Sequence, residues 1–526
     1  MTQTVQPILC DGEWITSSGT NTFQAVNPST EQPMPQTFPV SPWEEIDRVL
    51  AVAAATAKKM RGWPGSRFAE FLEVYADEIE ARADLLVETA HQETGLPVSP
   101  RLKDAELPRT TNQIRLAAGA ARDESWRVPT IDTGSGIRSM FGALGPVVVF
   151  GPNNFPYAYN GIAGGDFAAA IAAGNPVIAK GHPSHPETTR IFAEAAMAAI
   201  QKTGMPTGLV QLIYRTSHED GLKLVSDPRI GGVGYTGARQ TGLRLKAAAD
   251  AAGKPVYLEL SSINPVFMLP GALKERMEAI AEDFRISCLM GAGQFCTNPG
   301  LVVIPAGDLG EAFMEEVASR FEKAGSGTML SEGVRRNFLA AVNTLKEAGA
   351  AVVTGGAAGG GTGVCVQNTL LRADAETFLK NPHALQTEAF GNGSLMITAQ
   401  STEQMAEIAE LLEGNLTGSI YSDTRGTDDA DALQIEKVLR TKVGRLLNDK
   451  MPTGVAVVSS MNHGGPFPAT GHPGFTAVGV PGSVTRFGML QSYDNVRQDR
   501  LPPVLQNSNP AGAWRRVDGN WTRDQL

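Results

Sequence analysis

Short apolar runs alternate with longer amphipathic or alanine-rich stretches between residues 144 and 260. The apolar runs are rich in Val, Ile and Leu, which is typical of strands buried on both faces of a parallel sheet. The stretches between them have the spacing of helices, and the first ends at a glycine. Five such strands joined by four helices predict a doubly wound α/β sheet. We expect the strands at residues 144–150, 176–180, 209–214, 230–235 and 255–260, and the helices at residues 164–174, 187–202, 219–225 and 240–252.

The same alternation starts again in the second half of the chain. Strands are expected at residues 301–305 and 351–353, with helices at residues 310–324 and 333–348 between them. This pattern predicts a second α/β domain. Past Pro502 the chain becomes polar, and the pattern assigns Trp514 and Trp521 to no element.

The composition is that of an ordinary soluble globular protein. The 526 residues leave room for two or three domains, and 42% are hydrophobic and 19% charged. A net charge of −10 gives no basic surface for nucleic acid. The segment Met1–Gln6 has no signal-peptide pattern, and no apolar run is long enough to span a bilayer. We therefore expect neither export nor membrane insertion.

Four cysteines are present, and none forms a CxxC pair, which argues against a disulfide framework and favours the reducing cytoplasm. Only Cys296 lies in a glycine-flanked turn, where the main chain can approach closely enough to stabilise a thiolate. The other three are expected to be structural thiols, since Cys10 precedes the first expected element, Cys288 lies in an apolar run and Cys365 lies in a strand-like Val-Cys-Val. Cys296 is thus the candidate nucleophile.

Polar residues occur at or just after the carboxyl ends of four expected strands. They are Asn154, Lys180, Gly237 and Glu259. Because doubly wound sheets bind their ligands at this edge, we expect these residues to lie close together. Glu259 is the carboxylate that would serve Cys296 as a base.

Two segments resemble the aldehyde dehydrogenase superfamily. Residues 293–296 match its Gly-Gln-x-Cys turn and residues 258–260 match its Leu-Glu-Leu segment, and the resemblance extends from about residue 26 to about residue 504. It implies oxidation of a small aldehyde to a carboxylic acid. Cys296 would attack the aldehyde carbon, the Asn154 amide and the Cys296 N–H would hold the oxyanion, and Glu259 would activate the hydrolytic water.

The resemblance also implies an aldehyde-dehydrogenase-like α/β fold of several parts. These are a dinucleotide-binding domain (residues 1–125 and 148–260), a catalytic domain (261–482), a small β flap for oligomerisation (126–147 and 483–505) and a C-terminal tail (506–526). Segments 126–138 and 483–493 resemble the paired strands through which relatives dimerise. We expect a homodimer or homotetramer.

For the cofactor, the resemblance places the phosphate-side turn at Thr236 and Gly237, with Gly242 five residues further on. Glu388 and Phe390 match a Glu-x-Phe-Gly turn that holds the nicotinamide ribose and ring. Phe150 and Pro152, at the end of the first strand, complete the expected cofactor site.

NADP is expected in preference to NAD, although NAD use stays open. NAD-preferring relatives commonly have a glutamate three residues after the strand-end lysine, and this chain has Pro183 there. Without that carboxylate, Lys180 and Arg215 can attract a 2′-phosphate. His182 and His185 are expected to be loop residues, because prolines flank them and no Cys or Asp cluster is near, so no metal site is predicted.

The substrate is less well determined. The His-Pro repeat and the segment around Arg109 and Arg115 resemble the subgroup of ketoglutarate-semialdehyde (2,5-dioxovalerate) and NADP-linked long-chain aldehyde dehydrogenases. Either arginine could meet a substrate carboxylate. A long aliphatic aldehyde is the alternative, in a tunnel lined by Phe155, Tyr159, Phe295, Phe467 and Phe475.

Two other classes of protein stay open. An acyl-transferring relative would pass the thioester to coenzyme A or phosphate, and such relatives often lack the base that Glu259 provides. A catalytically silent homologue would not need Cys296, Asn154 and Glu259 together.

Overall fold

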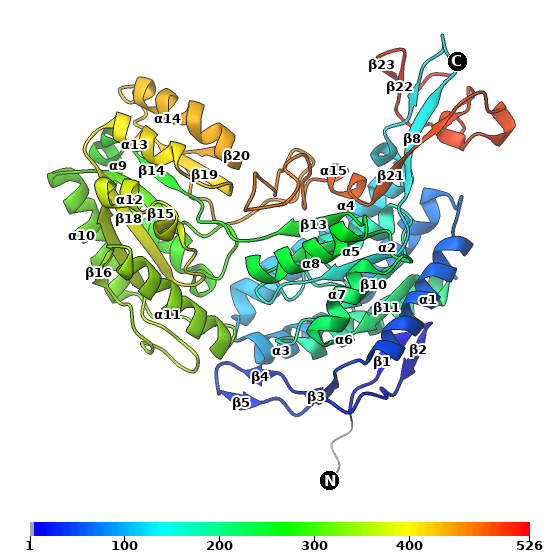
Figure 1. Cartoon of the computed structure of the whole chain (residues 1–526), viewed down its shortest axis with the longest axis horizontal. Helices are drawn as coiled ribbons and strands as arrows, with labels where there is room; N and C mark the ends of the chain where they lie inside the picture. Colours follow the sequence, from blue (N-terminus) through cyan, green and yellow to red (C-terminus); the bar gives the residue numbers. More distant parts are fainter. Residues whose placement is uncertain (1–4) are drawn as a thin grey trace.

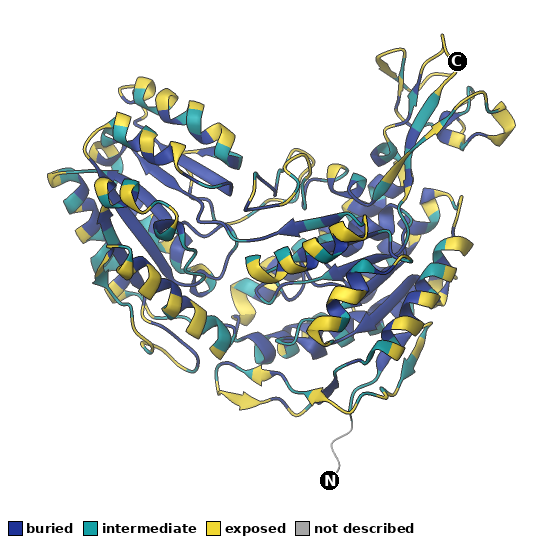
Figure 2. Ribbon diagram, in the orientation of Figure 1, coloured by how far each residue is buried: buried dark blue, intermediate teal, exposed yellow. Residues whose placement is uncertain are grey.

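The computed structural model describes residues 5–526. Two α/β units lie side by side, and a small β-sheet projects from the first of them beside the C-terminus (Figure 1). The strands of both units are buried, and most of the exposed surface lies on the outer faces of the helices (Figure 2). The predicted α/β fold class is confirmed. Within residues 5–526, no helix combines the length and the apolar character needed to cross a membrane.

The first unit is a seven-stranded sheet in the order β13-β12-β9-β10-β11-β1-β2, in which the central strands are parallel and β1 and β2 are antiparallel. All five predicted strands are present, and each begins one to three residues later than expected. The largest difference is at β9. It begins only at Val147, because Gly145 has a φ of +118° and Pro146 has no N–H to donate to a neighbouring strand. The strands are β1 (Ile8–Cys10), β2 (Glu13–Ile15), β9 (Val147–Phe150), β10 (Val177–Lys180), β11 (Val210–Ile213), β12 (Gly232–Thr236) and β13 (Val256–Glu259).

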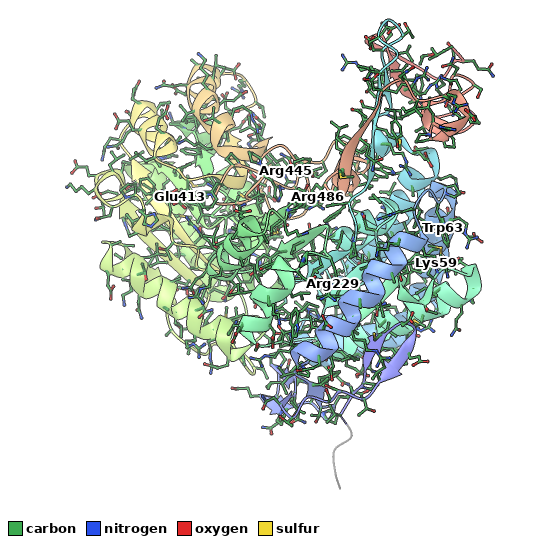
Figure 3. All side chains as sticks on the ribbon, turned by 45° about the vertical axis from the view of Figure 1, so that its right-hand side comes forward. Lys59, Trp63, Arg229, Glu413, Arg445 and Arg486 are labelled. Atoms are coloured by element: carbon green, nitrogen blue, oxygen red, sulfur yellow. The ribbon has the colours of Figure 1, made fainter. Side chains whose placement is uncertain are left out.

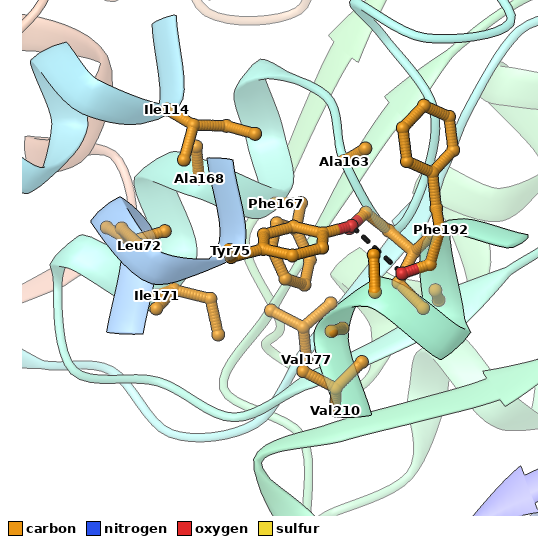
Figure 4. Close-up of a cluster of buried hydrophobic side chains, with 14 of the residues drawn as sticks. Leu72, Tyr75, Ile114, Ala163, Phe167, Ala168, Ile171, Val177, Phe192 and Val210 are labelled. Carbon is orange, nitrogen blue, oxygen red and sulfur yellow. Dashed lines mark hydrogen bonds between the residues drawn. The ribbon is translucent and has the colours of Figure 1, made fainter. Parts of the chain in front are cut away.

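Helices cover both faces of this sheet. Successive side chains of each strand point to opposite faces, so they pack alternately on the two helix layers. Val147 and Val149 pack on one layer of helices, whereas Val148 packs on the other. In the first layer, the buried Tyr75 hydroxyl donates to the Ile162 carbonyl oxygen at 2.7 Å. It also lies 3.3 Å from the Phe192 carbonyl oxygen, the contact drawn in Figure 4. The first layer holds α2 (Gly65–Glu80), α3 (Ala83–Thr94), α4 (Leu107–Asp123), α5 (Gly165–Ala172) and α6 (Pro186–Thr203), and the second holds α1 (Trp43–Lys59), α7 (His218–Ser226) and α8 (Arg239–Ala251).

The second unit repeats this architecture with the sheet order β16-β17-β18-β15-β14-β19-β20, in which only the edge strand β16 is antiparallel. Its strands are β14 (Val266–Met268), β15 (Leu301–Pro305), β16 (Ala351–Thr354), β17 (Thr369–Asp374), β18 (Gly393–Ala399), β19 (Asn415–Tyr421) and β20 (Val443–Asn448). Its helices are α9 (Pro270–Leu289), α10 (Asp308–Lys323), α11 (Glu332–Glu347), α12 (Ala375–Lys380), α13 (Thr402–Glu410) and α14 (Asp429–Lys442).

The projecting sheet has five strands in the order β21-β8-β7-β22-β23. β8 (Arg138–Ala143) pairs with β21 (Gly488–Tyr493), so the long strand lies mostly after the segment 126–138 in which the sequence predicted it. Residues before it form a 3₁₀ turn and the short β7 (Thr130–Ile131), since Pro129 and two glycines interrupt regular pairing. The polar tail, for which no element was predicted, adds β22 (Arg515–Val517) and β23 (Asn520–Thr522).

The segment between β20 and α15 (Gly482–Thr485) returns from the second unit to the first. The Leu260 N–H donates to the Ala469 carbonyl oxygen at 2.8 Å, and Glu259 and Thr470 form an isolated bridge. Beyond α15, Arg486 forms an ion pair with Asp166 of α5 at 2.6 Å, and Figure 3 labels it where the two units meet. This return segment therefore passes directly over the carboxyl end of β13.

Candidate active site

Three side chains from distant parts of the chain meet between the two α/β units. The Sγ atom of Cys296 lies 3.5 Å from Nε2 of His463, and that nitrogen lies 2.8 Å from Oε1 of Glu259. Glu259 is 4% exposed and His463 is 2% exposed, so the carboxylate and the imidazole are both shielded from water. The sequence predicted Cys296 and Glu259, and the structure adds His463 between them.

A different segment of the backbone positions each of these three side chains. Glu259 is the last residue of β13, and the return segment carries His463, whose backbone N–H donates to the Thr476 hydroxyl at 3.0 Å. Cys296 follows a turn that needs glycine at position 293, because φ there is +67° and a Cβ would lie 2.0 Å from the Gly391 carbonyl oxygen.

Side-chain amides hold the nucleophile turn in place. The Asn264 amide donates to the carbonyl oxygens of Cys296 at 2.9 Å and of Asn298 at 2.8 Å. Gln294 accepts from the Leu330 N–H at 2.8 Å and donates to the Gly291 carbonyl oxygen at 3.0 Å. The sequence did not predict either role, because such contacts join segments that are far apart along the chain.

Asn154 lies against the same turn. Its side-chain amide donates to the Gln294 carbonyl oxygen at 3.0 Å, which leaves the second amide hydrogen without an assigned acceptor among the described residues. The backbone N–H of Cys296 makes no hydrogen bond to any residue from 5 to 526. Two donors are thus available next to the sulfur, as an oxyanion site requires.

The electrostatics of the site favour a neutral thiol beside an ionised carboxylate. Burial raises the pKa of Cys296 well above its usual value, the Glu259 charge raises it further, and the Arg109 charge opposes this. Burial would also raise the pKa of Glu259, but the charge and hydrogen bond of His463 overcome it and bring that pKa below its usual value. Glu259 is therefore the proton acceptor of the pair.

An aromatic cluster lies next to the catalytic side chains. The Phe155 ring contacts the rings of Tyr159 and Phe295 edge-on, at centroid distances of 5.2 and 5.4 Å. The Tyr159 ring lies 5.8 Å from the His463 ring, so the cluster reaches the nucleophile. The Arg109 guanidinium lies over the Tyr159 ring at 5.2 Å.

Three further residues that the sequence predicted to contact the substrate lie away from this cluster. Arg115 forms ion pairs with Asp77 and Glu80 at 2.7 and 2.5 Å, and 39% of its side chain is exposed. Phe467 is 55% exposed and lies beside Arg239. The five aromatic residues expected to line a tunnel do not form one cluster, since Phe475 packs on Tyr257 instead.

The expected cofactor residues follow the carboxyl edge of the first sheet. Phe150 packs on Tyr235 at a centroid distance of 6.1 Å, and the Pro152 carbonyl oxygen accepts from Nε2 of His185 at 2.9 Å. Lys180 ends β10, and Arg215 follows β11 beside it. Burial, aided by the Arg215 charge, lowers the pKa of Lys180 to about 8.

The glycines of the phosphate-side turn have packing roles. The Gly237 N–H already donates to the Glu259 carbonyl oxygen at 3.1 Å, so it cannot face a phosphate. A Cβ on Gly242 would lie 2.5 Å from Leu260 and 2.8 Å from Tyr235, which makes this glycine necessary for α8 to pack on the sheet. Thr236 ends β12 just before this turn, and the first N–H groups of α8, from Arg239 onward, remain available for a phosphate.

Glu388 and Phe390 lie on the opposite side of the Cys296 turn. Both line a small cavity that also includes Phe295 and Ser262. Burial raises the pKa of Glu388 to about 7, while hydrogen bonds from Ser261 and Ser262 oppose the increase. A carboxylate beside a cavity fits the binding of a polar ligand group such as a ribose hydroxyl.

The ligand atoms of Glu259, Cys296 and His463 lie within 4.8 Å of one another, close enough for one metal ion to contact all three. The sequence suggested only His182 and His185 as possible metal ligands, and their rings stack at a centroid distance of 5.4 Å. The prediction that this protein has no metal site stays a prediction.

The arrangement of two α/β units around a buried cysteine and glutamate defines a class of enzyme that forms covalent thioesters. The chain belongs to the aldehyde dehydrogenase family, whose model matches residues 14–459. It is a nicotinamide-dependent oxidoreductase that acts on aldehydes.

Named relatives cover nearly the whole chain. Alpha-ketoglutaric semialdehyde dehydrogenase 2 of Azospirillum brasilense is 40% identical over 518 residues, which are 95% of this chain and 96% of that protein. Alpha-ketoglutaric semialdehyde dehydrogenase of Acinetobacter baylyi is 34% identical, with 96% of each chain covered. A solved structure of 3,6-anhydro-L-galactose dehydrogenase in complex with NAP has a TM-score of 0.81 at 21% identity and covers 93% of this chain and 99% of its own.

Proposed function

We propose that this enzyme oxidises 2-oxoglutarate semialdehyde (2,5-dioxopentanoate) to 2-oxoglutarate with NADP. The contacts of His463 with both Glu259 and Cys296 are the observation that carries the reaction type, because they bring a nucleophile and a base into one water-shielded site. The names of the two relatives at 40% and 34% identity support the substrate.

In the acylation half of the reaction, Glu259 accepts the thiol proton of Cys296, and the sulfur adds to the aldehyde carbon. The developing oxyanion accepts hydrogen bonds from the Asn154 amide and the Cys296 N–H. Such a donor typically contributes about 2.7 to 4 kcal/mol of transition-state stabilisation. A nicotinamide held in this site would supply the hydride acceptor, and Cys296 would then carry a thioester.

Once the thiol proton has left Glu259 for solvent, the carboxylate accepts a proton from water in the deacylation half, and the resulting hydroxide adds to the thioester carbon. Collapse of this second adduct breaks the C–S bond and releases the carboxylic acid, and Glu259 returns its proton to the thiolate of Cys296. His463 holds one oxygen of Glu259, so the other oxygen, Oε2, which has no partner among the described residues, remains free to take the proton.

NADP is the proposed cofactor because the end of β10 offers a cation without a carboxylate. Lys180 has Arg215 beside it, and Pro183 stands where a ribose-binding glutamate would be. A 2′-phosphate would find attraction here, whereas the ribose hydroxyls of NAD would find no acceptor of that kind. Thr236, Phe150, Pro152, Glu388 and Phe390 remain proposed cofactor contacts.

We also propose a cytoplasmic homo-oligomer that forms through the projecting sheet. β21 is an edge strand of that sheet, and its Met489 and Leu490 are 48% and 61% exposed. Such an apolar edge favours pairing with a second copy. The four cysteines are free, which fits a reducing compartment.

Two alternatives compete with hydrolysis of a semialdehyde. The aromatic cluster of Phe155, Tyr159 and Phe295 would also suit an aliphatic aldehyde, and an acyl-transferring enzyme would use coenzyme A. NADPH formation with 2-oxoglutarate semialdehyde, measured with and without coenzyme A, tests all three. We expect turnover that does not depend on coenzyme A, and a strict requirement for it would overturn the proposal.

A further inference from the structure

We propose that Arg445, together with Arg109, forms a subsite that binds the carboxylate of an anionic aldehyde. This inference rests on the proposed function, because it explains how the same active site selects a 2-oxo acid rather than an uncharged aldehyde. The sequence named Arg109 as a candidate and did not name Arg445.

Arg445 is a cation that is held in place without a counter-ion. It lies on β20, where the two units meet (Figure 3), and its guanidinium donates to the carbonyl oxygens of Pro452 at 2.9 Å and Gly454 at 3.2 Å. Across residues 5–526 no carboxylate lies within 4.0 Å of it, and its buried Nε has no partner. Burial lowers its pKa, which is the mark of a charge that loses hydration without gaining a carboxylate.

Arg109 also lacks a carboxylate partner among the described residues. Its guanidinium lies over the rings of Tyr159 and Phe155 at 5.2 and 5.7 Å, and its buried Nη1 has no partner among the described residues. Arg101 provides the contrast, since it lies over the same Phe155 ring but is neutralised by an ion pair with Glu106. Among the described residues, two of these three arginines thus have no carboxylate partner.

Arg445 and Arg109 both contact one apolar cluster. Arg445 Nη1 lies 3.7 Å from Sδ of Met461, and Met461 packs on the cluster that contains Tyr159 and Phe155. Tyr159 in turn lies against His463, which contacts the Cys296 sulfur. An aldehyde carbon at Cys296 would thus have apolar walls beside it and uncompensated positive charge beyond them.

This arrangement favours a substrate with a negative charge at the end remote from the aldehyde. A carboxylate would neutralise the buried guanidinium groups through charge-assisted hydrogen bonds, which an uncharged aldehyde cannot form. The carbonyl oxygens of Pro452 and Gly454 fix the orientation of Arg445 before the substrate arrives, so little side-chain freedom is lost on binding.

The first experiment compares two aldehydes on the unmodified enzyme. Catalytic efficiency with 2-oxoglutarate semialdehyde should exceed that with pentanal, an uncharged aldehyde of equal carbon number, by at least about tenfold. Equal efficiencies, or a preference for pentanal, would overturn the subsite while leaving aldehyde oxidation intact. Failure to oxidise either aldehyde would instead overturn the proposed function.

The second experiment measures the ratio of those two efficiencies in Arg445→Met and Arg109→Met. Each variant should lower the ratio by about tenfold or more, mainly by raising KM for the semialdehyde. Arg445→Lys should lose less, because it keeps the charge but not the paired donors. Arg115→Met, on the same helix as Arg109 but turned to the surface, is the matched control and should leave the ratio unchanged.

A ratio that stays at the parent value in Arg445→Met would exclude Arg445 from the subsite. If that variant does not fold, Arg445→Lys decides the matter, since an unchanged KM for the semialdehyde in this variant would also exclude a paired contact. NADP binding provides the folding check, because Arg445 is not among the proposed NADP contacts.

Discussion

The Nε2 atom of His463 lies 2.8 Å from Oε1 of Glu259, although 204 residues separate the two in the chain. The same nitrogen is 3.5 Å from the Cys296 sulfur, so one imidazole contacts both the nucleophile and its base. His463 is the strongest influence that lowers the pKa of Glu259 against the effect of burial. It thereby keeps the base ionised in a site where water is scarce.

Replacing His463 with Ala should shift the pH dependence of turnover. Without the imidazole, burial dominates and the pKa of Glu259 rises, so less of the base is ionised at a given pH. The acidic limb of the kcat profile should therefore move to higher pH. Steady-state rates measured from acidic to alkaline pH will show this shift.

His218→Ala is the matched control for this prediction, because His218 is exposed at the start of α7. Its profile should overlay that of the parent enzyme. An acidic limb at the parent position in His463→Ala would mean that His463 does not set the ionisation of Glu259.

NADP binding should weaken as the pH rises through about 8. Lys180 has its pKa lowered to about 8, so it is a cation below that pH and neutral above it. The 2′-phosphate then loses its attraction, whereas NAD has no such group to lose. Titration calorimetry at about pH 7 and about pH 9.5 should show a larger increase in Kd for NADP than for NAD. Lys180→Met should remove the difference, and parallel changes for both cofactors in the parent would contradict the contact.

Introducing a carboxylate at position 183 should change cofactor preference. Pro183→Glu places a negative charge beside Lys180, which repels the 2′-phosphate and offers an acceptor to the ribose of NAD. The ratio of catalytic efficiencies should move toward NAD by about tenfold to a hundredfold, mainly through KM for NADP. Pro183→Gln has a similar size without the charge and should move the ratio much less. Equal shifts in the two variants would show that charge is not the cause.

The sequence predicted the parts of the site that depend on regular structure. Asn154, Lys180 and Glu259 were placed together because parallel strands end at one edge of a sheet, and they lie along that edge. Cys296 was identified from its glycines, and Gly293 has the positive φ and close backbone contact that exclude other residues. The positions of these residues could be predicted because each depends on local geometry, whereas their roles stay predictions.

The sequence did not predict His463, because the return segment has no periodic pattern. Its position is fixed by backbone contacts: a Cβ on Gly464 would lie 2.6 Å from the Phe475 carbonyl oxygen, and one on Gly465 would lie 2.3 Å from that of Asn415. The His-Gly-Gly run was the available signal, since consecutive glycines after a histidine indicate close packing of the main chain.

The two candidate arginines of α4 show a second limit of prediction from the sequence. Arg109 and Arg115 are six residues apart, which in an α-helix puts them on different faces. Helical spacing alone indicates that both cannot face one site, but it does not say which one does. The ion pairs of Arg115 with Asp77 and Glu80 of α2 resolve this, because they depend on tertiary packing.

The central claim is that Cys296 carries the acyl group and that Glu259 is needed to release it. Peptide mass spectrometry of Glu259→Gln, mixed with 2-oxoglutarate semialdehyde and NADP, tests this claim most directly. A neutral amide cannot take a proton from water, so the thioester should accumulate with roughly one NADPH per active site. We predict a mass increase equal to a 2-oxoglutaryl group on the peptide that contains Cys296, and none in a Cys296→Ala variant that still binds NADP. An unmodified Cys296 after NADPH has formed, or an acyl group on another residue, would contradict the account.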